Sequence, residues 1–263
     1  MLDREGRVFA WRGETYNTVS ADGIAPVLRN AVVATEDKRF FSHLGIDPRG
    51  IASAIKINMA EGRGPLEGNG GSTITQQYVK NALVGNERSY QRKANELVYS
   101  VKMTNQWSKE DILRAYLNTV YFGRNAYGIQ AASKAYFNKD VSRLNPSEGA
   151  FLASVINAPG LYDPANGARA KEAVRARMTY VLDGMVQIGS LKQSERASMQ
   201  YPKVYPQPAA AVETPGPNGL IKRQVMAELN KLNISEQQVR TEGLKITTTI
   251  DPKAQNAAVQ AAC

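Results

Sequence analysis

The chain has 263 residues, of which 43% are hydrophobic and 22% charged, an ordinary balance for a globular protein that excludes wholesale disorder. Its formal net charge of +9 at pH 7 predicts an anionic partner, either a nucleic acid, an acidic membrane surface or a phosphorylated substrate, although a basic surface without a partner stays open. The single cysteine, Cys263, excludes an internal disulfide and a cysteine-based metal site. Without a long apolar run or a signal-peptide pattern, the chain is expected to be soluble or peripheral, or a fragment of an anchored protein.

Helical periodicity dominates the first part of the chain. An apolar stripe over residues 24–35 predicts a helix that leads directly to Glu36. A second helix is expected to start at Asp47-Pro48, and its apolar stripe consists of Ile51, Ala54, Ile55, Asn58 and Met59. A glycine-rich loop over residues 61–71 separates this helix from the next one.

Further helices are expected from their caps and their periodicity, at residues 73–83, 89–103, 112–122, 126–137, 146–156 and 168–186. Ser72 or Thr73 is expected to cap the helix at 73–83, and Ser89 the helix at 89–103. A capping box that starts at Ser108 precedes the helix at 112–122. Prolines then predict an extended linker, followed by a short helical piece, and residues 244–250 alternate like a strand. The predicted parts are a helical domain (1–200), a linker (201–243) and the start of another unit (244–263).

Glu36 is the first candidate for chemistry. It lies four residues after Val32, so it continues the apolar face of its predicted helix. A carboxylate in this place is either a partly buried structural acid with a partner or a functional group in a cleft, and its position alone does not choose. The only histidine, His43, is expected to pack beside Phe40 or to cap the helix end, because a histidine triad or zinc site has no second member here.

The stretch "NGGSTITQQYVKN" brings glycines to a helix start, where free N–H groups and the positive end of the helix dipole can hold an anion. Ser72 and Thr73 can equally be ordinary helix caps. Gln76 and Lys80 are one turn apart, so an amide and an ammonium are expected to point the same way, and Asn81 extends this polar run. No Gly-Lys-Ser/Thr follows the glycines, which excludes a nucleotide-binding P-loop.

A second glutamate lies among cations in "ERSYQRKANE". Arg92 and Lys93 precede Glu96 by four and three residues, and Arg88 precedes the expected cap. A surface ion pair worth a few tenths of a kcal/mol would explain any isolated pair of this kind. Three cations around one glutamate favour a functional cluster, but only moderately.

Four motifs occur in order along the chain: "EDKRFFSHLGID", "GGSTITQQYVKN", "RKANE" and "KEDILRAYLNTVYFG". Together they closely resemble the glycosyltransferase domain of class A penicillin-binding proteins, over roughly residues 4–200. The later stretch "GLKITTTIDPKAQNAA" resembles the entry into the transpeptidase domain of that family, of which nearly all is missing here. The resemblance implies a mainly α, lysozyme-like fold with a larger lobe and a smaller, membrane-facing one, to which the predicted linker and C-terminal strand are added.

The resemblance also implies that lipid II is polymerised into glycan strands, with inversion and release of undecaprenyl pyrophosphate. Glu36, ionised near neutrality, suits the base, and three cations suit the charge on the departing phosphate: Lys80, Arg88 and Lys93. Glu96, the second predicted catalytic residue, either holds a divalent cation (Mg or Mn) or orients these cations. The other predicted substrate-binding residues are Asp37, Arg39, Ser72, Thr73, Gln76 and Asn81. No organic cofactor is expected.

Three other readings compete with the transferase. A lysozyme-like muramidase would also use a glutamate in a helical cleft, but it would not need the basic cluster. The second reading is a non-catalytic cell-wall-binding module. The third is a nucleic-acid binder, but the sequence lacks the known nucleic-acid-binding motifs and a recognisable set of stacking aromatic residues. The expected partners are therefore lipid II, the growing glycan strand, a membrane surface and, as further candidates, cell-wall synthesis proteins. The expected location is the extracytoplasmic face of the plasma membrane, with the anchor helix absent from this chain.

Overall fold

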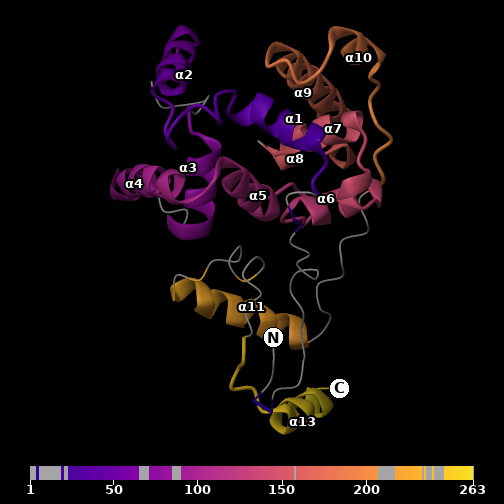
Figure 1. The fold of residues 1–263 in the computed structure, drawn as a ribbon. Helices are drawn as coiled ribbons and strands as arrows, with labels where there is room; N and C mark the ends of the chain where they lie inside the picture. The colour runs from indigo at the N-terminus through magenta and orange to yellow at the C-terminus, as the bar shows by residue number, and fades with distance from the viewer. Residues whose placement is uncertain are drawn as a thin grey trace. The chain divides into compact units, whose positions relative to one another are not determined.

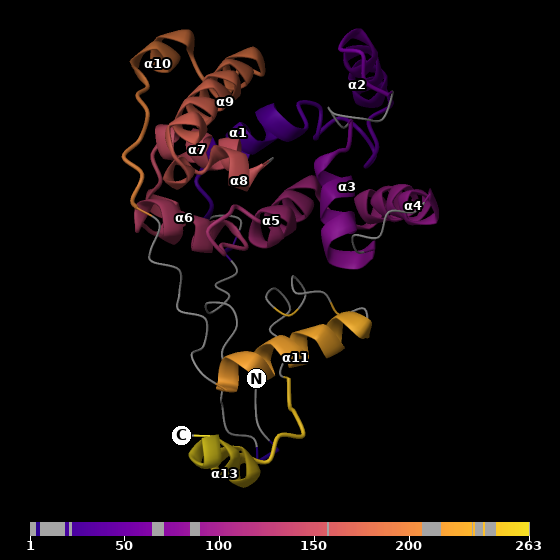
Figure 2. The same ribbon diagram turned by 180° about the vertical axis from the view of Figure 1, so that it is seen from behind.

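The structure is a computed structural model, which describes residues 4–5, 19–20, 23–64, 71–84, 90–156, 158–206, 217–232, 234, 239 and 246–262. The chain divides into two units, one formed by residues 18–206 and the other by residues 1–17 and 207–263. Figures 1 and 2 show the helices of each unit from two sides. The predicted domain boundaries at residues 200 and 243 stay predictions.

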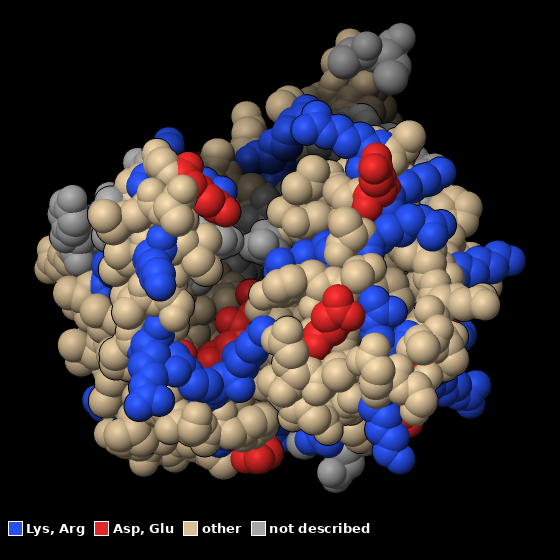
Figure 3. Space-filling view, turned by 90° about the horizontal axis from the view of Figure 1, so that it is seen from above, with Lys and Arg blue, Asp and Glu red and all other residues tan. Residues whose placement is uncertain are grey.

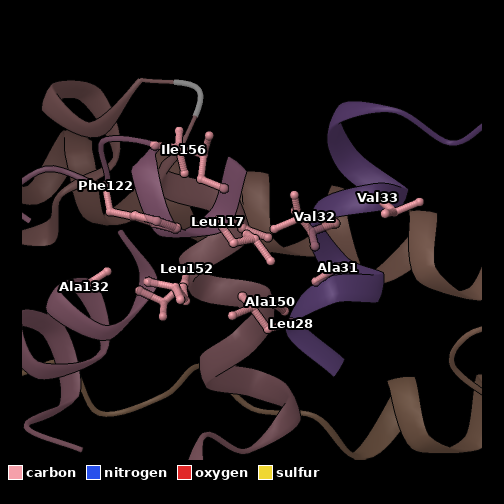
Figure 4. Close-up of a cluster of buried hydrophobic side chains, with 14 of the residues drawn as sticks. Leu28, Ala31, Val32, Val33, Leu117, Phe122, Ala132, Ala150, Leu152 and Ile156 are labelled. Carbon is pink, nitrogen blue, oxygen red and sulfur yellow. The ribbon is translucent and has the colours of Figure 1, made fainter. Parts of the chain in front are cut away.

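The core of the larger unit is built around three helices, α1 (Pro26–Glu36), α7 (Pro146–Val155) and α9 (Ala168–Gln187), which pack against one another. Every residue of α7 from position 148 to 155 is buried, and a helix that is buried all round belongs at the centre of a domain. Figure 4 shows Leu28 of α1 next to Ala150 of α7. The predicted stripe of α1 is therefore confirmed, and the burial extends beyond it to Val33 and Ala34.

A second group of helices lies on the other side of α1. It consists of α2 (Pro48–Ala60), α3 (Ile74–Val79), a π-helical turn η2 (Lys80–Val84) and α4 (Tyr90–Gln106). α5 (Lys109–Thr119) packs against α3 and, at its other end, against α6 (Ile129–Phe137). In both ribbon views α2, α3 and α4 gather on one side of this unit and α6 to α10 on the other, as predicted for two lobes.

The remaining elements are short turns and helices. In the larger unit they are η3 (Val141–Arg143), α8 (Pro159–Tyr162), η4 (Pro164–Asn166) and α10 (Gln193–Ser198). The other unit contains α11 (Pro217–Lys231), which is the helical piece expected beyond the prolines, and α13 (Pro252–Ala262). Of the predicted strand at 244–250, the described residues 246–250 form no ladder and hold one bridge residue, Thr247. The mainly α fold class is confirmed.

The helix starts agree with the predicted caps at two positions and differ at one. Thr73 caps α3 and Ser108 caps α5, each accepting a hydrogen bond from a backbone N–H three residues on. Asp47 precedes Pro48 as expected but is not assigned a side-chain cap hydrogen bond; its carboxylate accepts three hydrogen bonds from Arg39, at 2.5 and 2.7 Å from Nη2 and at 3.0 Å from Nε. The predicted cap Ser89 lies outside the described residues.

α2 differs from the predicted amphipathic helix. Asn58 is its only buried residue, whereas Met59 of the expected stripe is 61% exposed and the three remaining members of the stripe are half-buried. Ile57, which lies outside the stripe, is 44% exposed. An apolar face was predicted correctly, but protein covers little of it. In the described part of the chain, no helix combines the length and the apolar character that crossing a membrane requires.

Candidate active site

Glu36 ends α1 and lies where the two groups of helices meet. Its Oε2 accepts a hydrogen bond from Gln77 Nε2 of α3 at 3.1 Å, and its Oε1 is 3.7 Å from Arg177 Nη2 of α9. The side chain is only 11% exposed, and its Oε1 is buried and has no hydrogen-bond donor among the residues that the structure describes. Burial raises the pKa of Glu36 above its ordinary value, whereas the Gln77 hydrogen bond and the Arg177 charge act in the opposite direction.

Gln77 is itself held in place by a hydrogen bond from the protein interior. The hydroxyl of Tyr116, a fully buried residue of α5, donates to Gln77 Oε1 at 2.8 Å. The amide of Gln77 thereby presents its NH₂ group to the carboxylate of Glu36. Neither Gln77 nor Arg177 was predicted from the sequence, although both contact the predicted base.

Asp37, the neighbour of Glu36, points into the protein. Its carboxylate lies 2.9 and 3.0 Å from His43 Nε2 and accepts the backbone N–H of Ile74 at 3.1 Å. Gly45 N–H donates to His43 Nδ1, so the ring proton lies on Nε2 and points to Asp37. His43 also packs edge-on against Phe40, which is one of its two predicted roles. Asp37 therefore joins the end of α1 to the start of α3.

Two glycines allow this close packing. Gly45 adopts φ +89°, and a Cβ there would lie 2.4 Å from the carbonyl oxygen of Ser100 in α4. At Gly71 a Cβ would lie 2.6 Å from Cα of Ile51 in α2. Since real Cβ atoms do not approach backbone so closely, larger residues would force these segments apart.

The start of α3 uses two of the predicted substrate-binding residues for its own structure. Thr73 and Gln76 form a capping box, in which Gln76 N–H donates to Thr73 Oγ1 at 3.1 Å and Thr73 N–H to Gln76 Oε1 at 2.9 Å. Both side chains are almost fully buried, and Thr73 Oγ1 also donates to the carbonyl of Gly45. These contacts favour the capping role that the sequence left open. Gln77, rather than Gln76, faces the predicted base.

The signal that separates these two glutamines is present in the sequence. A capping box has the spacing Ser/Thr-x-x-Glu/Gln, and Thr73 to Gln76 has this spacing. The cap occupies Gln76 and leaves Gln77 for another face of the helix. No comparable local signal identifies Arg177, because it lies among several arginines of α9 and reaches Glu36 only through tertiary packing.

Glu96 is 2% exposed and lies among cations, as predicted. Arg92 Nη1 donates to its Oε2 at 2.8 Å, and Lys93 Nζ contacts its Oε1. Lys93 Nζ is also 3.3 Å from the hydroxyl of Ser72, which brings a third predicted residue to the cluster. Because the Lys93 side chain is 43% exposed, its charge is accessible to a ligand even while it contacts Glu96.

The other predicted residues are placed as follows. Lys80 and Asn81 open the π-helical turn after α3, and both are half-buried. Arg39 forms its ion pair with Asp47 at the start of α2. Arg88 lies outside the described residues. Viewed from above, the surface is hollowed, with acidic side chains inside the hollow and Lys and Arg around it (Figure 3).

The described residues do not resemble a metal site. No group of three or more His, Cys, Asp or Glu side chains that could hold an ion occurs among them. Both oxygens of Glu96, the predicted ligand, already contact cationic side chains. The observed contacts therefore fit the alternative in which Glu96 orients the neighbouring cations.

Comparison with known proteins gives consistent matches. Residues 5–186 match the family model described as Transglycosylase. Penicillin-binding protein 1A of Mycolicibacterium smegmatis is 53% identical over 250 residues, which are 92% of this chain and 31% of that protein. Penicillin-binding protein 1A of Mycobacterium tuberculosis is 51% identical over 241 residues, which are 89% of this chain and 28% of that protein. The chain thus spans about three tenths of the length of these relatives.

Among solved structures, a penicillin-binding protein 1A from Haemophilus influenzae aligns with 99% of this chain and 28% of its own, at 18% identity and a TM-score of 0.43, and we draw nothing from so distant a match. The family model, by contrast, matches more than half of the 263 residues and includes Glu36, the α3 start and the Glu96 cluster. This chain belongs to the Transglycosylase family.

Proposed function

We propose that this chain is a peptidoglycan glycosyltransferase, which polymerises lipid II into glycan strands. The 4-hydroxyl oxygen of one sugar attacks the anomeric carbon of another, whose bond to the pyrophosphate oxygen breaks. The electrons of the broken bond stay on the oxygen of the pyrophosphate, which leaves attached to its polyprenyl carrier. The attacking hydroxyl gives up its proton, and the configuration at the anomeric carbon inverts. One observation carries this proposal within the family: Glu36 is a largely buried glutamate, and one of its carboxylate oxygens has no hydrogen-bond donor in the described part of the chain.

Glu36 is proposed as the base that takes the hydroxyl proton. A base must be ionised, and burial opposes ionisation by raising the pKa of Glu36. The hydrogen bond from Gln77 and the positive charge of Arg177 both favour the carboxylate. A substrate hydroxyl would supply the donor that Oε1 lacks, so substrate binding would satisfy a buried acceptor and bring the proton to the base.

The cations are proposed to stabilise the charge that develops on the departing pyrophosphate. Lys93 is accessible and is oriented by Glu96 and Ser72, which matches the preorganised charge that such a transition state requires. Lys80 and Arg88 are proposed to share this role. Asp37, Thr73 and Gln76 are proposed to act indirectly, by holding α1 and α3 together. The predicted divalent cation stays a prediction.

A muramidase is the competing function, because it too would use a glutamate. The cluster around Glu96 favours the transferase, since a hydrolase that protonates a leaving sugar does not need cations for a pyrophosphate. Incubation of the chain with fluorescent lipid II, followed by gel separation of the products, distinguishes the two. We expect a ladder of glycan polymers. Breakdown of preformed glycan without any polymer would instead support the hydrolase.

The substrate proposal implies that the site works at a membrane surface, because a polyprenyl tail stays in the bilayer. The loop after α1 and helix α2 expose four large apolar side chains: Phe41 (56%), Leu44 (69%), Ile57 (44%) and Met59 (61%). Lys56 and Arg63 are exposed in the same segment. Apolar side chains beside cations suit shallow insertion among anionic headgroups. We propose that this segment contacts the membrane.

The chain is therefore expected to bind vesicles that contain anionic lipid, and Ile57→Asp is expected to weaken this binding several-fold. The new carboxylate would have to approach the headgroups and lose its own hydration. Sedimentation with vesicles at low salt measures the bound fraction. Leu161→Asp is the matched control, because Leu161 is 48% exposed but lies on α8. Equal losses in both variants, or no binding by the unmodified chain, would contradict the assignment.

A further inference from the structure

A chain of two hydrogen bonds connects the interior of the protein to the proposed base. The Tyr116 hydroxyl donates to Gln77 Oε1 at 2.8 Å, and Gln77 Nε2 donates to Glu36 Oε2 at 3.1 Å. The three residues come from α5, α3 and α1, so helices that are distant in sequence meet at this point. Tyr116 is fully buried and cannot touch a substrate.

The direction of these hydrogen bonds follows from the chemistry of the groups. An ionised carboxylate only accepts hydrogen bonds, so Gln77 must turn its NH₂ group to Glu36 and its carbonyl oxygen to Tyr116. Burial raises the pKa of Tyr116 well above its ordinary value, so the hydroxyl keeps its proton and donates. If Gln77 turned its amide over, two acceptor oxygens would face each other at Glu36. The Tyr116 hydroxyl favours the correct orientation because it provides the donor that only this orientation can use.

We propose that Tyr116 is a positioning residue for the proposed base, which acts by fixing the orientation of the Gln77 amide. This inference rests on the proposed function of Glu36. It explains why a tyrosine hydroxyl lies in the core beside an otherwise apolar helix face, where an unpaired polar group would be costly. It also assigns a role to Gln77, which donates to the carboxylate and so favours its ionised form.

The consequence for pH dependence has a definite sign. Burial raises the pKa of Glu36, and the charge of the neighbouring Asp37 acts in the same direction, whereas the Gln77 hydrogen bond and the charge of Arg177 on α9 lower it. Without the Tyr116 hydroxyl the amide would spend part of its time turned over, and the pKa of Glu36 would rise. A base with a higher pKa is protonated up to a higher pH. The acidic limb of the activity profile would therefore move to higher pH.

Tyr116→Phe is the direct test, because it removes the hydroxyl and keeps the ring in the core. In the full 263-residue chain we expect kcat for lipid II polymerisation at pH 7 to fall about fivefold, the change that corresponds to one hydrogen bond of roughly 1 kcal/mol. KM is expected to stay unchanged, and the acidic limb to move to higher pH. Tyr136→Phe is the matched control, since its buried hydroxyl donates to the carbonyl of Phe122 at 2.8 Å, away from Glu36. Tyr136→Phe should lower the free energy of unfolding by a similar amount without moving the acidic limb of the pH–activity profile.

A double-mutant comparison tests whether Tyr116 acts through Gln77. We expect Gln77→Ala to move the acidic limb at least as far as Tyr116→Phe does, and Tyr116→Phe to add nothing in the Gln77→Ala background. A further shift in that background would overturn the proposed route. A shift of the same size in Tyr136→Phe would likewise overturn it, because the effect would then follow from general loss of packing.

A readout apart from activity separates this proposal from the proposed function. The side-chain carboxyl carbon of Glu36, assigned by its loss in Glu36→Gln, can be titrated by ¹³C NMR in the chain and in Tyr116→Phe. We expect the titration midpoint to rise in Tyr116→Phe but not in Tyr136→Phe. An unchanged midpoint would overturn the role of Tyr116 even if the chain polymerises lipid II. Conversely, polymerisation by Glu36→Gln would exclude Glu36 as the base, and absence of polymerisation by the unmodified chain would remove the proposed function, while this titration still decides the hydrogen-bond chain.

Discussion

Glu36→Gln is expected to lower lipid II polymerisation by at least about a hundredfold, the lower end of what a positioned general base contributes. The amide is nearly isosteric with the carboxylate, so its oxygen can still accept the hydrogen bond from Gln77. It cannot take the proton of the attacking hydroxyl. The initial rate with fluorescent lipid II measures the loss.

The fold of Glu36→Gln is expected to be preserved, because replacing a largely buried carboxylate with an amide removes a desolvation cost. Its thermal unfolding midpoint should therefore stay close to that of the unmodified chain. Glu172→Gln, at an exposed position of α9, is the control for loss of one negative charge and should leave the rate unchanged. A folded Glu36→Gln variant that polymerises at a comparable rate would exclude Glu36 as the base.

Arg124→Met is expected to destabilise the larger unit by about 3–5 kcal/mol, the cost of removing one partner from a buried ion pair. The Arg124 side chain is 1% exposed, and its Nε and Nη2 each lie 2.7 Å from an oxygen of Asp163. Its Nη1 donates to the carbonyls of Ala135, at 3.0 Å, and Tyr205, at 2.8 Å. The substitution leaves the buried Asp163 carboxylate without its cation and removes the hydrogen bond from Arg124 to Tyr205 in the segment after α10.

Urea unfolding measures this loss as a lower free energy of unfolding. Arg114→Met is the matched control, because Arg114 is 42% exposed and pairs with the exposed Asp111 at 2.7 Å. A surface pair of this kind contributes at most about 1 kcal/mol. Adding Asp163→Asn to Arg124→Met should recover part of the stability, since the remaining side chain is then neutral. If Arg124→Met and Arg114→Met lowered the free energy of unfolding by similar amounts, burial of the Arg124–Asp163 pair would not explain its contribution to stability.

Much of the architecture follows from local sequence. The α7 and α9 helices end within one residue of their expected bounds, α1 buries its expected stripe, and Ser108 caps α5 as expected, because helix formation depends on neighbours within one or two turns. The position of Glu36 on an apolar helix face and the cations next to Glu96 were also predictable, since both depend on spacing along one helix. The sequence by itself thus determined the helical class, the family motifs and the proposed base.

Tertiary structure alone decided what surrounds that base. Arg177 reaches Glu36 from α9, and Tyr116 orients Gln77 from α5, through contacts between segments far apart in the chain. Periodicity identifies the apolar face of a helix but not what covers it, which is why the exposure of Met59, a member of the expected stripe of α2, did not follow from periodicity. Asp47 shows the same limit, because its carboxylate pairs with Arg39 in the loop after α1, a contact that its position before Pro48 does not predict. Local spacing selects the residues that can act, and packing between distant helices selects the partners that set their charge and orientation.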